Sequence, residues 1–423
     1  MSLEVVCGIN WGDEGKGRVV DYLARDVDLV VRFQGGNNAG HTVVNELGTF
    51  KLHLIPSGIF NPRVVNVLGP GMVIDLQGLV EELTDLEGQG VRGQVVVSDR
   101  ATICFPFHRD EDAWEEERLG GAAYGSTKRG IAPAYGDRHL KKAIQIGELA
   151  HPQHLERRLR ELVEWKNLIA RGVYGREDGV DLGRVLDWVR EFGPPVLERV
   201  RDTGRLLTDA WNADKRILCE AQLGALRDVY FGIYPFTSSS CPLAGFAGVG
   251  SGLAQAPTRT IGVVKAFSTC VGAGPFVTEI HGEFADSLRE SANEYGAATG
   301  RPRRIGHFDA LASAYGVRAQ GATELALTKL DCLTGLDPLR ICTHYELDGK
   351  RLDGFPILPL LERAKPVYVD HPGWRERIEG VREFGDLPEA TRSYVLEIER
   401  LLECPIRHVS VGAEREAMIV RAA

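Results

Sequence analysis

The segment with the clearest chemical potential is a glycine-rich loop near the N-terminus, Gly8–Gly17 (GINWGDEGKG). Glycines allow backbone N–H groups to crowd around a phosphate, and the N-terminus of a following helix adds partial positive charge. Lys16 adds a full positive charge. A Walker A loop would instead need glycine at Asn10 and serine or threonine at Gly17. The loop therefore predicts an unusual nucleotide-phosphate site, although the same residues would also suit an ordinary turn with a surface lysine.

Asp13 lies inside this loop and is a candidate for two roles. The hydroxyl with which a Walker A loop holds magnesium is missing, so another oxygen must serve. Magnesium prefers hard oxygen ligands and often takes only one or two carboxylates together with phosphates. The Asp13 carboxylate could be that ligand, and it could also accept a proton from a substrate.

A second loop, Gln34–Thr42 (QGGNNAGHT), carries amide side chains between glycines and contains His41. Such a loop suits hydrogen bonding to a flat heterocycle, and the histidine could protonate or stabilise an oxyanion. A lone histidine is more often a structural residue. Loops at the carboxyl ends of parallel strands share one sheet edge, however, so we expect His41 near Asp13.

The elements that must position these loops are short β-branched runs alternating with glycine turns. With the helical stretch Gly17–Arg25 after the first run, they indicate βαβ units. The predicted strands are Leu3–Cys7, Asp28–Phe33, Val64–Leu68, Val95–Val97, Arg216–Cys219, Thr260–Lys265, Leu325–Leu330 and Arg407–Val411. Pro388–Glu403 predicts a late amphipathic helix. We expect an α/β fold with a large, mostly parallel central sheet flanked by helices, similar to P-loop NTPases.

The middle of the chain has a different pattern. Apolar residues recur at helical spacing among Glu and Arg, which predicts a helical subdomain inserted at about residues 150–215. The residues of this pattern are Leu155, Leu159, Leu162, Val163 and Trp165. No internal repeat or low-complexity tract interrupts the sequence, so we expect a single catalytic domain over residues 1–423.

Composition excludes several classes of protein. With 43% hydrophobic and 26% charged residues the chain has a globular composition. No run of about 18 apolar residues and no signal-type N-terminus occurs, so neither a membrane span nor export is indicated. Eight scattered cysteines without a C-x-x-C pair argue for reduced thiols, and we expect a cytoplasmic protein. The net charge of −9 disfavours nucleic-acid binding, so an anionic ligand must rely on local positive charge.

The two loops together resemble the N-terminal signature of the adenylosuccinate synthetase family. Seven further blocks resemble the family in the same order: Leu52–Gly58, Gly125–Tyr135, Tyr234–Ser239, Val271–Phe276, Gly296–Arg304, Leu327–Asp331 and Ser410–Gly412. The resemblance spans nearly the whole chain. It implies a ligase that joins L-aspartate to IMP with GTP, through a 6-phosphoryl-IMP intermediate. The products would be adenylosuccinate, GDP and phosphate, in the first committed step from IMP to AMP.

The resemblance also implies residue roles. Asp13 would remove the N1 proton of IMP and, with the carbonyl of Gly40, bind one Mg²⁺ per subunit, while His41 would stabilise the transferring phosphoryl group. Lys141 would reach the IMP site of the partner in a homodimer. The implied GTP site is Gly12, Gly15, Lys16, Gly17, Gly40, Thr42, Arg303, Lys329, Asp331, Ser410 and Gly412. The implied IMP site is Asp13, Lys16, Asn38, Gly40, His41, Thr127, Lys141, Gln222, Ser238 and Arg301. The implied aspartate site is Thr299, Gly300, Arg301 and Arg303.

The sequence departs from the family pattern at a few positions. Glu220–Gly224 reads EAQLG where the family usually has EGAQG, so Gln222 stands one residue early. Ala298 and Pro302 replace a usual threonine and arginine of the aspartate loop. Cys270 also replaces a usual arginine, and at Lys141 a lysine keeps the charge without the bidentate fork.

Two other functions are compatible with a nucleotide-binding loop. A GTPase or small-molecule kinase predicts a conventional Walker A loop, which is missing. A nucleotide sensor without catalysis predicts loss of the acid–base residues, whereas Asp13 and His41 are both present. The altered aspartate loop keeps the sensor open as an alternative.

Overall fold

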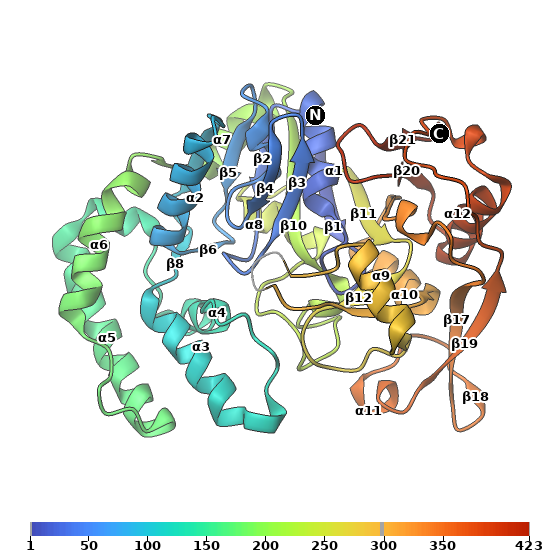
Figure 1. Cartoon of the computed structure of the whole chain (residues 1–423). Coiled ribbons are helices and arrows are strands. Elements are labelled where there is room, and N and C mark those ends of the chain that lie inside the picture. The colour runs from blue at the N-terminus through green and yellow to red at the C-terminus, as the bar shows by residue number, and fades with distance from the viewer. Residues whose placement is uncertain (1, 297–299, 423) are drawn as a thin grey trace.

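A ten-stranded sheet forms the centre of the computed structural model, which describes residues 2–296 and 300–422 (Figure 1). Its strand order is β21-β20-β16-β11-β1-β10-β2-β5-β7-β9, and every neighbouring pair is parallel except β20 and β21. The strands are β1 (Ser2–Gly8), β2 (Leu29–Arg32), β5 (Val65–Leu68), β7 (Gln94–Ser98), β9 (Val200–Arg201), β10 (Arg216–Gly224), β11 (Arg259–Lys265), β16 (Glu324–Thr328), β20 (Ile406–Ser410) and β21 (Met418–Val420). The predicted α/β fold with a mostly parallel sheet is confirmed.

Burial on both faces explains why these strands are almost continuously apolar. Leu3 and Val5 of β1 pack in one cluster with Leu207 of α7 (Thr203–Asn212). Val6 faces the other way and packs with Val19 of α1 (Lys16–Leu23). Helices therefore cover both faces of the sheet, and the carboxyl ends of its central strands are left for loops.

The remaining helices are α2 (Leu76–Gly88), α3 (Pro106–Leu119), α4 (Ile131–His139), α5 (Pro152–Tyr174), α6 (Leu182–Leu197), α8 (Ala247–Ser251), α9 (Glu283–Ser291), α10 (Ala310–Gln320), α11 (Leu358–Leu361) and α12 (Glu389–Leu402). The last of these confirms the predicted late helix. Small sheets add β3 (His41–Asn45), β4 (Gly48–Leu52), β6 (Val73–Ile74), β8 (Thr102–Ile103), β12 (Ser268–Cys270), β13 (Glu279–Ile280), β14 (Arg304–Gly306), β15 (Phe308–Asp309), β17 (Leu339–Leu347), β18 (Lys350–Arg351) and β19 (Lys365–His371).

The segment at about 150–215 contains α5, α6, β9 and α7, and α5 and α6 lie at one side of the molecule (Figure 1). Leu159 of α5 and Trp188 of α6 share a core cluster with Phe105, next to α3. Strand β9, however, pairs with β7 at the edge of the main sheet. The division into one catalytic domain with an inserted helical subdomain stays a prediction.

A buried ionic cluster joins α3, α4 and α5. The Asp137 carboxylate lies 2.9 Å from Nε2 of His108 and 2.8 Å from Nζ of Lys166, which also pairs with Glu111 at 2.6 Å. Burial raises the pKa of Asp137, but His108 and Lys166 outweigh it and hold the pKa below its usual value. Asp137 therefore stays ionised and ties the three helices together. Within residues 2–296 and 300–422, no helix is long and apolar enough to cross a membrane.

We expect Asp137→Ala to lower the free energy of unfolding by about 3 kcal/mol, because removing one partner of a buried ion pair leaves the other groups poorly compensated. Urea denaturation measures this loss. The matched control is Asp187→Ala on α6, whose pair with Arg190 at 2.7 Å is exposed. That change should cost less than about 0.5 kcal/mol. Equal effects of the two substitutions would contradict the assignment.

Candidate active site

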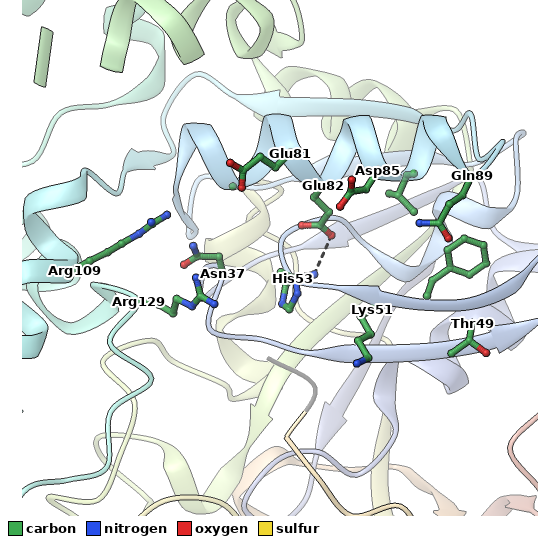
Figure 2. Close-up of a pocket in the computed structure, with 13 residues that line it drawn as sticks. Asn37, Thr49, Lys51, His53, Glu81, Glu82, Asp85, Gln89, Arg109 and Arg129 are labelled. Carbon is green, nitrogen blue, oxygen red and sulfur yellow. Dashed lines mark hydrogen bonds between the residues drawn. The ribbon is translucent and has the colours of Figure 1, made fainter. Parts of the chain in front are cut away.

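A groove of about 510 Å³ lies between α2 and strand β4 (Figure 2). Charged side chains line it from both sides, among them Lys51, Asp85 and Arg109. The Glu82 carboxylate beside it accepts hydrogen bonds from the backbone N–H groups of residues 53–55. None of the residues predicted from the sequence for catalysis or ligand binding lines this groove.

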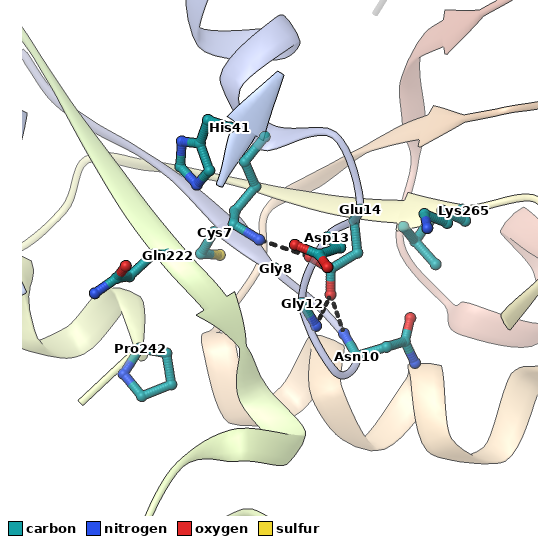
Figure 3. A network of polar contacts seen from close by, with 12 residues as sticks. Cys7, Gly8, Asn10, Gly12, Asp13, Glu14, His41, Gln222, Pro242 and Lys265 are labelled. Carbon is teal, nitrogen blue, oxygen red and sulfur yellow. Dashed lines mark hydrogen bonds and ion pairs between the residues drawn. The ribbon is translucent and has the colours of Figure 1, made fainter. Parts of the chain in front are cut away.

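The predicted phosphate loop joins β1 to α1 and wraps around one of its own carboxylates (Figure 3). Glu14 is 2% exposed and accepts hydrogen bonds from the backbone N–H groups of Asn10 (3.1 Å) and Gly12 (2.8 Å). Its other oxygen lies 2.6 Å from Nζ of Lys16, which is also buried. The loop therefore has the geometry of an anion site, and in this structure the anion is Glu14.

Gly17 shows why this loop lacks the Walker A hydroxyl. A Cβ at Gly17 would lie 2.9 Å from the Cβ of His41 and 3.0 Å from Oγ of Ser57. A serine or threonine there would collide with the catalytic candidate from the second loop.

Asp13 lies in the left-handed region of backbone space, with φ of 62°. Such strain in a non-glycine residue is typical of functional sites. Its side chain is 30% exposed, and its Oδ2 accepts a hydrogen bond from Nε of Arg303 at 2.9 Å. The structure thus brings together a predicted base and a predicted aspartate-binding residue that are 290 positions apart.

The side chain of Arg303 also forms an ion pair with Glu294, which is fully buried. Nη1 of Arg303 and Nζ of Lys265 each lie 2.7 Å from Oε2 of Glu294. Burial raises the pKa of Glu294, but Lys265, Arg303 and Lys329 outweigh it and lower the pKa to about 2. Burial lowers the pKa of Lys265 to about 8. Sequence reasoning missed Glu294 because nothing local shows that it is buried among three cations.

His41 is fixed by Glu220, which the sequence analysis did not assign to the site. The Nδ1 atom of His41 lies 2.5 Å from Oε1 of Glu220, whose carboxylate also accepts from the N–H and Oγ–H of Ser57, both at 2.7 Å. Burial lowers the pKa of His41 more than Glu220 raises it. Burial raises the pKa of Glu220, but His41 and Arg32 outweigh it and lower the pKa to about 2.

An ionised Glu220 can only accept a hydrogen bond, so Nδ1 of His41 carries the proton and Nε2 is the nitrogen left for a ligand. The only sequence signal for Glu220 was its place at the start of the EAQLG block.

A cavity of about 430 Å³ opens beside Asp13. Five of the residues predicted for the site line it: Gly12, Asp13, Asn38, Thr127 and Ser238. They come from four separate segments of the chain. This convergence is the strongest structural support for an acceptor-nucleotide subsite.

Gln222 is predicted to contact IMP, but it does not line this cavity. It is fully buried, its Oε1 accepts from Nη2 of Arg32 at 3.1 Å, and Figure 3 shows its amide pointing away from Asp13. A Cβ at Gly35 would lie 0.9 Å from its Nε2, so the amide fills the space above that glycine. Leu223 lines the cavity instead, with φ of 61°. The physical reason is the one-residue shift, since successive side chains of a strand face opposite ways.

The predicted guanine site lies where the neighbouring parallel strands β16 and β20 end. Lys329 has φ of 63° and donates to the carbonyl of Ala292 at 2.6 Å. Asp331 has one oxygen, Oδ1, that is buried and has no hydrogen-bond partner among residues 2–296 and 300–422. Burial raises the pKa of Asp331. A buried acceptor without a donor is what a ligand with N–H groups would satisfy.

Ser410 and Gly412 belong to the same edge. Ser410 is hydrogen-bonded by Arg18 of α1 and donates to the carbonyl of Gly412 at 3.2 Å. Arg18 also donates to the carbonyls of Glu414 and Ala417, both at 2.7 Å, and so holds the segment after β20 against α1.

Other predicted residues have less defined surroundings. Gly15 is the residue before α1, and Gly40 and Thr42 flank His41. In the aspartate loop, Gly300 donates to the carbonyl of Gly296 at 2.7 Å, and Gly296 donates to that of Arg301 at 2.8 Å. Thr299 and Ala298 lie outside the described residues. Lys141 is exposed after α4 and does not line the 430 Å³ cavity of its own chain.

A magnesium ion would have few protein ligands here. Among the described residues no three or more His, Cys, Asp and Glu side chains gather to hold a metal. The partly exposed carboxylate of Asp13 is a hard oxygen donor, and such a donor fits a magnesium ion whose other ligands are phosphate oxygens and water.

Comparisons with known proteins agree with this geometry. The family model of adenylosuccinate synthetase matches residues 5–419. An adenylosuccinate synthetase 2 from Pseudoalteromonas translucida is 49% identical over 419 residues, covering 99% of both chains. An adenylosuccinate synthetase from Caldanaerobacter subterraneus is 44% identical, again with 99% coverage of both chains. The structure of fully ligated adenylosuccinate synthetase from Plasmodium falciparum superimposes over 100% of both chains with a TM-score of 0.93 at 32% identity. The chain belongs to the adenylosuccinate synthetase family.

Proposed function

We propose that this GTP-dependent ligase, which joins L-aspartate to IMP, carries out its chemistry with the residues gathered around Asp13. The observation that carries the proposal is the convergence of Asp13, Asn38, Thr127 and Ser238 on one cavity, with Arg303 on the Asp13 carboxylate. Mixing the protein with IMP, aspartate, GTP and magnesium, and omitting each in turn, tests it by the ultraviolet change of the purine. Product that needs all four components supports the proposal, and GTP hydrolysis without IMP or aspartate contradicts it.

In the first step, Asp13 takes the N1 proton of IMP, so the 6-oxygen becomes the nucleophile. That oxygen attacks the γ-phosphorus of GTP, GDP leaves, and 6-phosphoryl-IMP forms. His41 is neutral with Nε2 unprotonated because burial lowers its pKa. To donate a hydrogen bond to the transferring phosphoryl group, it must therefore gain a proton as negative charge approaches, with ionised Glu220 behind it.

In the second step, the amine of aspartate displaces phosphate from carbon 6, and the proton that the amine loses passes to solvent. Arg303 is the residue for both the carboxylate of aspartate and the phosphate of GTP, because its planar guanidinium can bind either group. Its present contacts with Asp13 and Glu294 hold it at the site. Gly300, Arg301 and Thr299 complete the proposed aspartate site.

Guanine recognition is assigned to Lys329 and Asp331, with Ser410 and Gly412 closing the pocket. The unpartnered Oδ1 of Asp331 would accept from the N1–H and N2–H groups of guanine. Lys16, Gly15 and Gly17 would hold the phosphates, which requires Lys16 to exchange its contact with Glu14 for one with the ligand.

Magnesium would be held by Asp13 and the carbonyl of Gly40, one ion per subunit, and when bound it would neutralise phosphate charge during transfer. A homodimer in which Lys141 reaches the IMP site of the partner is part of the proposal, and the exposure of Lys141 supports it. The eight free cysteines support a reducing, cytoplasmic location.

We expect Asp13→Ala to abolish turnover and to spare folding, because the residue lies on a loop outside the core. Steady-state assays and a urea titration measure the two effects. A variant with near-normal rate would remove Asp13 from the role of base.

We expect Glu220→Gln to lower kcat by about 100-fold or more, because an amide can donate to Nδ1 of His41 and so favour the wrong tautomer. The substitution preserves shape, so the affinity for IMP should change little. Single-turnover kinetics measure phosphoryl transfer directly. An unchanged rate of that step would show that Glu220 does not orient His41.

We expect Asp331→Asn to reduce the preference for GTP over ATP, since the amide no longer presents two acceptor oxygens to the base. The ratio of kcat/KM for the two nucleotides measures it. An unchanged ratio would place guanine recognition elsewhere.

A further inference from the structure

Arg227 is a cavity residue that neither the sequence nor the reaction scheme above has used. It ends a 3₁₀ turn, Ala225–Arg227, directly after β10, and it is 8% exposed. The residue lines the 430 Å³ cavity together with Asp13 and Ser238. A nearly buried arginine beside a proposed nucleotide subsite needs a physical explanation.

The guanidinium of Arg227 joins two segments of the cavity wall. Nη1 donates to the carbonyls of Phe236 at 2.5 Å and Ala273 at 3.4 Å. Nη2 donates to the carbonyl of Val271 and lies 3.2 Å from Sγ of Cys270. The planar fork therefore ties the segment 236–239 to the segment 270–273, a geometry that a lysine could not reproduce.

The backbone of Arg227 adds to this arrangement. Its carbonyl accepts the N–H of Ser238 at 2.7 Å. Ser238 in turn shares a hydrogen bond of 2.8 Å with Oγ of Ser240. Both the side chain and the main chain of Arg227 thus set the position of Ser238, the residue proposed for the 5′-phosphate.

The charges that line the cavity make Arg227 more significant. Five carboxylates line it: Asp13, Glu111, Asp112, Glu115 and Glu116. Three of them pair with cations that do not line the cavity, Asp13 with Arg303, Glu111 with Lys166 and Glu115 with Arg118, which leaves Asp112 and Glu116 without a cationic partner among the described residues. Among the described residues, Arg227 is the one Lys or Arg side chain that does so. A dianionic phosphate would enter a negative field unless a cation offsets it.

Two of the carboxylates are fixed in place by the chain itself. Glu116 accepts hydrogen bonds from the N–H groups of Tyr124, Gly125 and Ser126, each at 3.0 Å. Asp112 accepts from Oγ of Ser126 at 2.7 Å and from the N–H of Gly130 at 3.0 Å. They hold the loop that leads to Thr127, so their negative charge is a built-in feature of the cavity.

The charge of Arg227 has no carboxylate partner within ion-pair distance in the part of the chain that the structure describes. Its acceptors are carbonyl oxygens and a thiol, which satisfy donors but do not neutralise a cation. A nearly buried cation without a counter-charge is unfavourable and is stabilised when an anion binds close by.

We propose that Arg227 is a positioning residue for the acceptor nucleotide, which fixes the two wall segments and adds positive charge for the nucleotide's phosphate group to that of the Lys141 brought by the proposed homodimer. This inference rests on the proposed IMP subsite. It is specific to the phosphate: a nucleoside without phosphate should gain nothing from the charge.

The test compares IMP with inosine on three variants of the full-length protein. Arg227→Met removes both charge and fork, and Arg227→Lys keeps the charge alone. The control is Arg392→Met. Arg392 also donates to two backbone carbonyls, those of Gly385 and Leu387, but it belongs to α12 and does not line the cavity. Calorimetric titration gives the Kd of IMP, inhibition gives that of inosine, and steady-state kinetics give the KM of GTP.

We expect Arg227→Met to raise the Kd of IMP about 10-fold or more, the scale of one charge-assisted contact. In the same variant, the Kd of inosine and the KM of GTP should stay within about 2-fold of their values in the unaltered protein. The Kd of IMP for Arg227→Lys should lie between those of Arg227→Met and the unaltered protein. Arg392→Met should match the unaltered protein in all three quantities. An unchanged Kd of IMP in Arg227→Met, or an equal loss for inosine, would overturn the inference. If Arg227→Met fails to fold, Arg227→Lys decides, since the loss of the fork that positions Ser238 should still raise the Kd of IMP selectively. Failure of the unaltered protein to bind IMP would instead overturn the proposed function.

Discussion

Three buried carboxylates at the carboxyl edge of the central sheet fix the groups that the rest of the site depends on. Glu14 holds Lys16, Glu220 holds His41, and Glu294 holds Arg303. Burying a carboxylate is costly unless it is paired and hydrogen-bonded, and each of these three is both. These pairs hold the three functional side chains at this edge of the sheet, and under the proposed function Lys16 exchanges Glu14 for a phosphate. The strand order matters for this reason, since it brings residues hundreds of positions apart to one edge.

The positions of the strands and of the loops that follow them could be predicted from sequence patterns alone, whereas the order of the strands in the sheet was not predicted. Alternating β-branched runs with glycine turns predict parallel strands because doubly buried strands must be apolar throughout, and every predicted run lies within or overlaps a strand. The same patterns placed Asp13 and His41 on loops at one edge. What they could not give is the far end of β10, which runs to Gly224 and so carries Glu220 and Gln222 within a strand. The face of the sheet on which the side chains of Glu220 and Gln222 lie depends on how β10 pairs with β1 and β2, and not on local residue types.

The buried carboxylates were also beyond sequence reasoning, for a related reason. Glu14, Glu220 and Glu294 look like surface residues in sequence because glutamate is rarely buried. Their burial follows from cations that arrive from other segments, such as Lys265 and Arg303 around Glu294. Gly17 illustrates the opposite case. Its identity is visible in the sequence, but the cause is the His41 side chain packed against it, which only the fold reveals.

The departures from the family pattern acquire physical meaning when they are placed in the structure. Leu223 presents an apolar side chain to the cavity while Gln222 turns into the core, so the cavity wall beside Gly12 loses an amide. The family usually has arginine at the position of Cys270, and in this chain Cys270 lies against the guanidinium of Arg227. A positive charge is therefore still present at that wall, although it comes from the turn after β10. Together they place an apolar side chain, Leu223, and a cation, Arg227, in the same cavity, whose lining also includes Asp112 and Glu116. At the proposed IMP subsite, the charge of Arg227 would therefore favour the phosphate group of the nucleotide, while Gln222 would contribute no hydrogen bond to the purine ring.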